Sequence, residues 1–200
     1  MILIITNKHK YFLALCIGLL PFNFIRIIFY KLLLNYNISW KAKIGFRTII
    51  SVDKATIASC SIGMLNIFTG PFDLMIADGV NIGNNNLFEC GYWIREQKEI
   101  EKHLKHQCVL RNHSLITNNH FFDITGKFDL GENSWVAGLG SQFWTHGGKV
   151  RADRDIVIGN NCYIASAVRF AQGVKITDNS LVPLGSIISS NRSTSCILPR

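Results

Sequence analysis

The chain has 200 residues, of which 48% are hydrophobic, and its formal net charge is +8. This length and apolar content are enough for one substantial core, so we expect one domain with a terminal extension. The positive charge favours an anionic partner, such as a phosphorylated cofactor, an acidic polymer or a membrane surface. The sequence has no zinc-finger spacing, no aromatic–basic RNA-binding signature and no basic recognition helix, so we expect no nucleic acid as a partner.

The six cysteines are scattered along the chain and form no C-x-x-C pair. Disulfide frameworks usually belong to shorter secreted chains, so we expect reduced and mostly buried thiols in a reducing compartment. The same spacing argues against a metal site built on cysteine.

Residues 1–39 predict an apolar, basic helix that associates with a membrane. The first 52 residues contain no Asp or Glu, and residues 11–34 read YFLALCIGLLPFNFIRIIFYKLLL. No small-residue cleavage site follows, which argues against a secretory signal peptide. Arg26 and Lys31 interrupt the apolar run, which argues against a simple bilayer span.

Three interpretations of this segment stay open: a helix lying in the membrane interface, a true membrane span, and a helix packed on the body of the protein. We favour the interfacial helix, with Arg26 and Lys31 facing anionic lipid headgroups. The basic bias would keep this segment cytoplasmic, which predicts a protein at the inner face of the cytoplasmic membrane.

Over residues 40–190 an aliphatic or aromatic residue returns every six positions. A helix repeats at about 3.6 residues and a two-sided strand at about two, so this period fits neither. It fits an all-β solenoid with short flat faces, in which one apolar residue of each face points inward and Gly or Asn occupies the corners. The longest run in phase is Ile158, Ile164, Phe170, Ile176, Val182 and Ile188.

Shorter runs with the same period precede it in shifted registers, and two charged segments interrupt them. Residues 95–107 are predicted to form a short, charged, helix-like insertion, and residues 145–155 a charged loop. The shorter runs are Ile44, Ile50, Ile62 and Phe68; Ile76, Ile82, Phe88 and Ile94; Leu110, Ile116 and Phe122; and Ile124, Leu130 and Val136.

With these repeats, residues 40–190 resemble the hexapeptide-repeat acyltransferases, and most closely their galactoside and capsule or colanic-acid O-acetyltransferase branch. NNHFFDITGKFDLGENSWVAGLGSQFWTHGG resembles the family's segment that ends in the catalytic His, and IVIGNNCYIASAVRF resembles the start of its acetyl-CoA side. The resemblance implies a left-handed parallel β-helix and a homotrimer, with acetyl-CoA as co-substrate in the groove between neighbouring solenoids.

The resemblance also implies roles for single residues. His146 takes the place of the catalytic His, and an imidazole is well matched to accept the proton of a sugar hydroxyl. Asn119 takes the place of an Asn that positions substrate. The implied contacts to acetyl-CoA are Tyr163, Ser166, Gly185 and Ser189.

Three further residues near His146 each have two interpretations. Trp144 would stack on the acceptor or pack within a coil. His120 would bind substrate or be packed and hydrogen-bonded locally. Asp123 would orient a His or form a local Asx turn.

This chain departs from the family's pattern at several positions. Tyr163 stands where many members have Trp, and Leu184 stands where Ala is usual. The family's Gly-x-Pro-Ala element and its basic residue are not matched in residues 191–200, which predicts a shortened C-terminal tail.

The sequence therefore predicts an enzyme that moves an acetyl group from acetyl-CoA to a hydroxyl of a sugar in a surface polysaccharide or its precursor. A non-catalytic or truncated β-helix scaffold is one alternative. The other is a zinc enzyme resembling the γ-class carbonic anhydrases, with His113, His120 and His146 as ligands. Their spacing lacks the close H-x-x-x-x-H pair, so no metal is expected.

Overall fold

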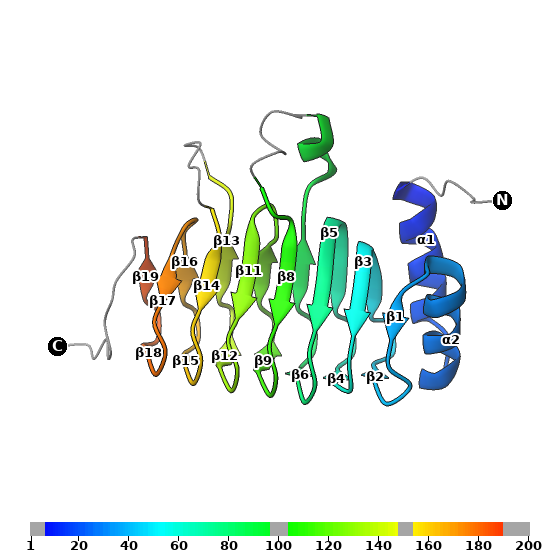
Figure 1. Ribbon diagram of the computed structural model, residues 1–200, viewed down its shortest axis with the longest axis horizontal. Helices are drawn as coiled ribbons and strands as arrows, with labels where there is room; N and C mark the ends of the chain where they lie inside the picture. Colours follow the sequence, from blue (N-terminus) through cyan, green and yellow to red (C-terminus); the bar gives the residue numbers. More distant parts are fainter. Residues whose placement is uncertain (1–6, 97–103, 148–153, 190–200) are drawn as a thin grey trace.

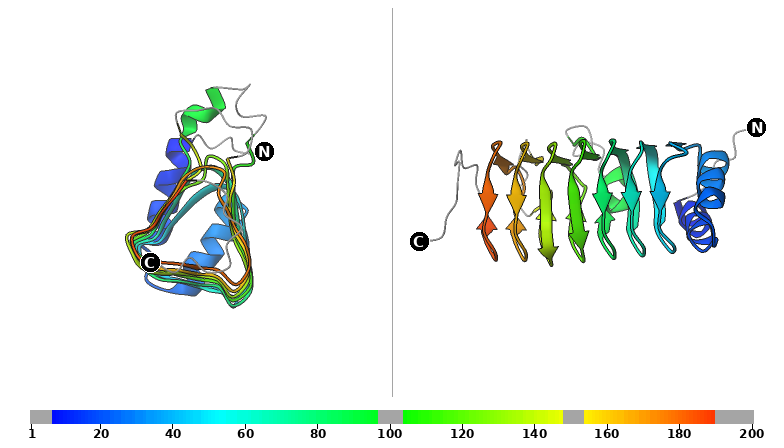
Figure 2. Two further views of the ribbon diagram at one scale, coloured as in Figure 1. Left: turned by 90° about the vertical axis from the view of Figure 1, so that its left-hand side faces the viewer. Right: turned by 90° about the horizontal axis from the view of Figure 1, so that it is seen from below.

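The computed structural model describes residues 7–96, 104–147 and 154–189. Two N-terminal helices, α1 (Asn7–Gly18) and α2 (Asn23–Leu34), precede nineteen short strands in this part of the chain. The strands pair in parallel and wind into a solenoid, whose outline is triangular when viewed along its axis (Figures 1 and 2). The parallel β-solenoid predicted from the period of six is confirmed.

The first face of the solenoid is a sheet of seven strands, in the order β18-β15-β12-β9-β6-β4-β2. Successive coils contribute one strand each, so every strand lies beside the equivalent strand of the next coil. The strands are β2 (Lys43–Ile44), β4 (Ser61–Ile62), β6 (Asn81–Ile82), β9 (Leu115–Asn118), β12 (Trp135–Leu139), β15 (Tyr163–Ile164) and β18 (Leu181–Val182).

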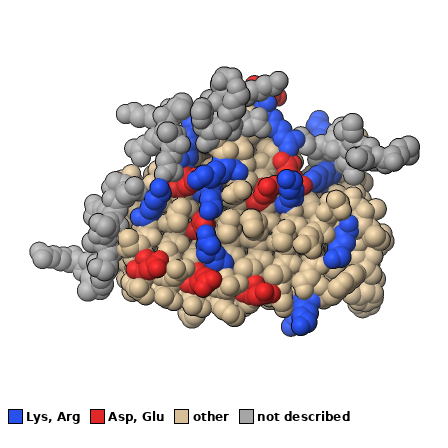
Figure 3. Space-filling model, in the orientation of Figure 1, with Lys and Arg blue, Asp and Glu red and all other residues tan. Residues whose placement is uncertain are grey.

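The second and third faces form one twelve-stranded sheet, because two long strands bend around the corner between them. These are β3 (Ile49–Ile57) and β5 (Ile67–Ile76); β1 (Asn37–Ile38) pairs with the end of β3. The second face continues through β7 (Leu87–Glu89), β10 (Phe121–Asp123), β13 (Gln142–Trp144), β16 (Arg169–Phe170) and β19 (Ile187–Ile188). The third face continues through β8 (Gln107–Leu110), β11 (Lys127–Leu130), β14 (Ile156–Ile158) and β17 (Lys175–Ile176), and carries mixed acidic and basic side chains (Figure 3).

The repeated apolar residues fill the solenoid, as predicted. All six members of the longest run are buried. Inside the second face Phe68, Phe88, Phe122, Phe143 and Phe170 stack, with successive ring centroids 4.3–4.9 Å apart. Stacked aromatic pairs add to the hydrophobic gain of burial, so this column stabilises five consecutive coils.

Asparagine occupies many corners because it tolerates the left-handed backbone conformation that the turns require. Asn85 and Asn119 have φ of 58° and 59° and stand one above the other, with 2.5 Å between Asn85 Nδ2 and Asn119 Oδ1. A second ladder at another corner joins Asn133, Asn161 and Asn179.

The two helices close the N-terminal end of the solenoid (Figure 1). Arg26 is buried and donates to the Ile44 carbonyl, at 3.1 Å from Nε and 2.6 Å from Nη2. Lys31 donates to the Ile38 carbonyl at 2.7 Å. The expectation that these two cations face lipid headgroups is therefore wrong, because unpaired carbonyls at the open end of the sheet bind them instead.

Neither helix in the described residues has the length and apolar content that crossing a bilayer requires. A buried polar network ties the helices to the first coil: the Tyr30 hydroxyl donates to the Thr48 carbonyl at 3.0 Å, and that of Tyr36 to Val52 at 2.8 Å. Burial raises the pKa of both phenols, so they stay neutral donors.

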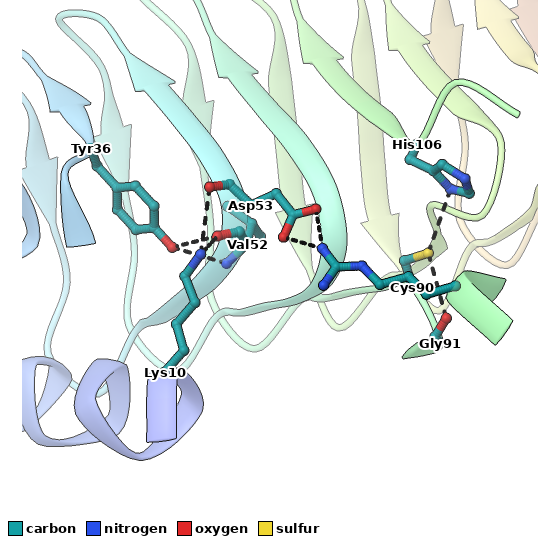
Figure 4. A network of polar contacts seen from close by, with 8 residues as sticks. Lys10, Tyr36, Val52, Asp53, Cys90, Gly91 and His106 are labelled. Carbon is teal, nitrogen blue, oxygen red and sulfur yellow. Dashed lines mark hydrogen bonds and ion pairs between the residues drawn. The ribbon is translucent and has the colours of Figure 1, made fainter. Parts of the chain in front are cut away.

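The insertion after β7 begins with a 3₁₀ helix, η1 (Tyr92–Glu96). Arg95 Nη2 donates to both carboxylate oxygens of Asp53 of β3, at 2.6 and 2.7 Å, and Lys10 of α1 donates to the neighbouring carbonyl of Val52 (Figure 4). The core of the helix-like prediction for 95–107, most of the loop 145–155 and the tail 191–200 lie outside the described residues.

Candidate functional site

The site lies where strands of the second face end. Register places Glu89, Asp123 and Trp144 side by side at the ends of β7, β10 and β13. The chain leaves the coil after β7 for the insertion and after β13 for the charged loop. Polar side chains from consecutive coils thus meet at one corner of the solenoid, beside the two largest departures from its regular path.

His146 and Asp123 form a hydrogen-bonded pair at this corner. His146 Nδ1 binds Asp123 Oδ2, and the backbone N–H of His146 donates to the same oxygen at 3.1 Å. The Asp123 side chain is 4% exposed, whereas that of His146 is 42% exposed. Because the carboxylate accepts from Nδ1–H, the neutral imidazole leaves Nε2 as a proton acceptor.

The other oxygen of Asp123 is held as firmly. Asp123 Oδ1 accepts from the backbone N–H of Thr125 at 2.9 Å and from its hydroxyl at 2.7 Å, which is an Asx turn. The two interpretations of Asp123 are therefore compatible: one oxygen makes the turn and the other binds His146. Thr145 fixes the start of the loop, since its hydroxyl donates to the Asp123 carbonyl at 2.8 Å and accepts from Gly126 N–H at 2.8 Å.

A cavity of about 230 Å³ opens beside the pair. Trp93 and Trp144 meet the His146 ring edge-on, with centroids 6.0 and 6.3 Å away, and Phe121 packs on Trp144 at 4.6 Å. Glu89 adds a second carboxylate to the lining. A base between aromatic walls and an acidic side chain suits a neutral, hydroxyl-bearing ligand with both apolar and hydrogen-bonding faces.

Cys90 also lines the cavity, but burial, with a further contribution from Asp123, raises the pKa of its thiol to about 12. A thiol with that pKa holds its proton near neutral pH and is a poor nucleophile. The arrangement therefore supports general-base chemistry by His146 and not acyl transfer through a cysteine.

The structure brings only one of the other predicted substrate residues to His146, namely Trp144. Asn119 belongs to a corner ladder at the opposite end of β10 and does not line the cavity. His120 is 2% exposed and both ring nitrogens are engaged: Nδ1 accepts from Ser141 N–H at 3.1 Å, and Nε2 lies 3.0 Å from the Thr117 hydroxyl. Burial lowers the pKa of His120 to about 4, so it is a neutral packing residue and not a substrate ligand.

The predicted acetyl-CoA contacts lie on or after β15, on the coils that follow His146, and none lines the cavity. Ser166 and Gly185 occupy consecutive turns, with Gly185 N–H donating to the Ser166 carbonyl at 3.0 Å. Tyr163 is exposed on the first face beside Trp135, with ring centroids 6.3 Å apart. Ser189 is exposed just after β19, in the row that continues from Glu89, Asp123 and Trp144 along the second face.

The three histidines weighed as zinc ligands stand at three different corners. His113 lies between β8 and β9, His120 between β9 and β10, and His146 after β13. Over the described ranges, no group of three His, Cys, Asp or Glu side chains could hold a metal ion.

Sequence reasoning missed Glu89, Tyr92 and Trp93. Glu89 follows the repeat residue Phe88 as Asp123 follows Phe122 and Trp144 follows Phe143, so the repeat register itself carried this signal. Trp93 belongs to the insertion, where the six-residue period does not predict where a side chain lies.

Comparison of the sequence with protein-family models gave no match, and a search among curated proteins also gave none. The structure therefore defines this protein as a parallel β-solenoid with a His–Asp pair at one corner.

Proposed function

We propose that this protein is a left-handed β-helix O-acetyltransferase that moves an acetyl group from acetyl-CoA to a sugar hydroxyl of a surface polysaccharide or its precursor. The observation that carries the proposal is the Asp123–His146 pair beside an aromatic-walled cavity. The sequence resemblance implies a catalytic base at His146, and in the structure that residue has a buried carboxylate partner and lines a cavity.

In the proposed reaction, His146 Nε2 removes the proton of the acceptor hydroxyl. The hydroxyl oxygen bonds to the carbonyl carbon of the acetyl thioester, and the tetrahedral adduct collapses as the carbon–sulfur bond breaks. The imidazolium then returns the proton to the sulfur, which releases CoA as a thiol. Asp123 holds the ring in the required tautomer and stabilises the imidazolium that forms.

The acceptor would lie against Trp93 and Trp144, which are 40% and 38% exposed. Glu89 would accept hydrogen bonds from further hydroxyls. This combination favours a sugar over a purely apolar alcohol, because the cavity offers polar partners as well as ring surfaces.

A homotrimer with acetyl-CoA between solenoids is supported by an exposed apolar strip on the first face. Trp135, Tyr163 and Leu181 lie side by side on β12, β15 and β18 and are exposed. Leu139 and Leu184 extend the strip at the adjacent corner, near Ser166 and Gly185. A neighbouring solenoid would cover this surface, and the cofactor contacts would lie at its edge.

The test is CoA release from acetyl-CoA with a panel of glycans, comparing the wild type with His146→Ala. We expect the substitution to lower turnover by about 10²–10⁴-fold, the usual contribution of a general base. His113→Asn is the matched control, because His113 sits in a distant turn with φ of 57°, which Asn also tolerates. Equal turnover in His146→Ala and the wild type would refute the proposal.

A further inference from the structure

The outer surface of the two N-terminal helices has no partner in the described structure. One face of α2 packs on the solenoid through Arg26, Ile27, Tyr30 and Leu34. On the opposite face Phe24 and Leu32 are 59% and 74% exposed. Phe12 of α1 and Leu19, which directly follows α1, are also exposed. Both helices lie at the same end of the solenoid (Figures 1 and 2), and we call their exposed apolar side chains, together with Leu19, the apolar end surface.

The cations of the helices divide into two groups. Lys10, Arg26 and Lys31 turn inward and donate to backbone carbonyls of the solenoid end. The exposed residues of α2 are therefore all apolar, which a helix in contact with water would rarely show; they are Phe24, Phe29, Leu32 and Leu33.

The second group consists of Lys8, Lys41 and Arg47, which lie next to exposed apolar residues at this end of the molecule and which we call the basic rim. Lys8 lies one helical turn before Phe12 on the outer face of α1. Lys41 follows the exposed Trp40, and Arg47 follows the exposed Phe46; the backbone N–H of Arg47 donates to Gly18 at the end of α1, at 2.8 Å. The right-hand end of the molecule in Figure 3 accordingly shows uncharged surface and basic side chains.

We propose that this end surface docks on an anionic lipid membrane, with the apolar side chains entering the interface and the basic rim contacting headgroups. An uncharged helical face with a basic rim is the arrangement that binds at such an interface. A second copy of the chain fits less well, because two-fold pairing would place the same basic rims against each other, and residues 1–52 offer no Asp or Glu to pair with them.

The test is co-sedimentation with vesicles, comparing phosphatidylcholine alone with a mixture containing phosphatidylglycerol. We expect the wild type to bind the anionic vesicles and to lose that binding as salt is raised. The double variant Phe24→Gln/Leu32→Gln should bind at least about ten-fold more weakly, because two large apolar side chains no longer enter the lipid. The control is Met75→Gln/Ile187→Gln, whose side chains are 47% and 72% exposed on the third and second faces, away from the helices and from the strip on the first face.

A second variant, Lys41→Gln/Arg47→Gln, tests the basic rim without touching the apolar surface. We expect it to weaken binding about five-fold for each charge removed and to leave the fold unchanged. The proposal is overturned if the wild type ignores anionic vesicles, or if Phe24→Gln/Leu32→Gln binds as tightly as the control. It is also overturned if light scattering without lipid shows that Phe24→Gln/Leu32→Gln lowers the mass of the assembly, since a second copy would then cover this surface.

Discussion

At the scale of single residues, Asp123 explains how a histidine at the start of a loop is held in one orientation. Its carboxylate accepts four hydrogen bonds: two from Thr125, and two from the backbone and ring of His146. A buried carboxylate is costly unless it is saturated in this way, so the arrangement positions His146 and satisfies Asp123 together.

Asp123→Asn should lower turnover with acetyl-CoA by up to about 10⁴-fold, because an amide no longer fixes the Nδ1–H tautomer or stabilises the imidazolium. The KM for acetyl-CoA should change little, since Asp123 positions the base and does not touch the thioester. Steady-state kinetics of CoA release measure both quantities.

Asp129→Asn is the control for that experiment. Asp129 is as buried as Asp123 but lies on the third face. Burial alone would raise the pKa of Asp129, but hydrogen bonds from Arg111 and Lys127 outweigh that effect and hold the pKa below its usual range. Its loss should reduce stability and leave turnover unchanged. If Asp123→Asn and Asp129→Asn behave alike, Asp123 has no positioning role.

His120 makes stability depend on pH. Burial lowers its pKa from 6.5 to about 4, so between these values an unfolded chain binds a proton that the folded chain does not. The free energy of unfolding should therefore fall as pH decreases from about 6.5 to about 4, by up to about 3 kcal/mol. Urea unfolding across this range should show the slope, and His120→Gln should flatten it; an unchanged slope in the variant would contradict this assignment.

The resemblance to the hexapeptide-repeat acyltransferases pointed to His146, and Trp144 was considered because it lies two residues before His146. The sequence left two interpretations of His120 open, because burial depends on which corner of the coil that residue occupies. It also could not place Asn119 relative to His146, because a left-handed corner and a ligand both favour Asn.

At the scale of elements, the column of phenylalanines joins the coils that carry the site. Phe122 lies 4.3 Å from Phe88, 4.7 Å from Phe143 and 4.8 Å from Phe128, measured between ring centroids. Phe122 therefore links β7, after which the insertion begins, to β13, which ends just before His146.

Phe122→Ala should lower the free energy of unfolding by about 3–5 kcal/mol, since it leaves a cavity in the middle of the column. Phe122→Leu should cost less, because it keeps more of the buried volume. Urea denaturation of both variants gives the comparison. A loss below about 1 kcal/mol for Phe122→Ala would show that the column does not hold the coils together.

The period of six predicted the strands well because each face of a coil buries one residue. An apolar residue therefore recurs at regular spacing in the sequence. The insertion has no such repeat. Its helix η1 is held by the Arg95–Asp53 ion pair, and tertiary contacts place Trp93 against His146. The sequence pattern therefore could not predict that Trp93 forms part of the aromatic wall of the site.

At the scale of the whole molecule, the helices close one end of the solenoid and the site lies near its middle. The cavity is lined by the second to fifth coils. With coils about 4.8 Å apart, it would lie about 20 Å from a membrane contacted by the helical end. The exposed strip on β12, β15 and β18 is separate from that end.

Tyr163→Asp should separate the proposed trimer, because it places three charges in an apolar interface. Light scattering should give three times the 22.5 kDa chain mass for the wild type and the mass of a single chain for the variant. A wild type that is already monomeric would contradict the proposed trimer. It would not bear on the proposed role of His146, which the assay of CoA release tests separately.

The most direct test of the central claim is product analysis after incubation with acetyl-CoA and a glycan acceptor. Mass spectrometry and NMR of the glycan should show a new acetyl ester on a sugar hydroxyl with the wild type, and almost none with His146→Ala or Asp123→Asn. No ester with the wild type across a broad glycan panel, or the same ester yield with His146→Ala, would contradict the account.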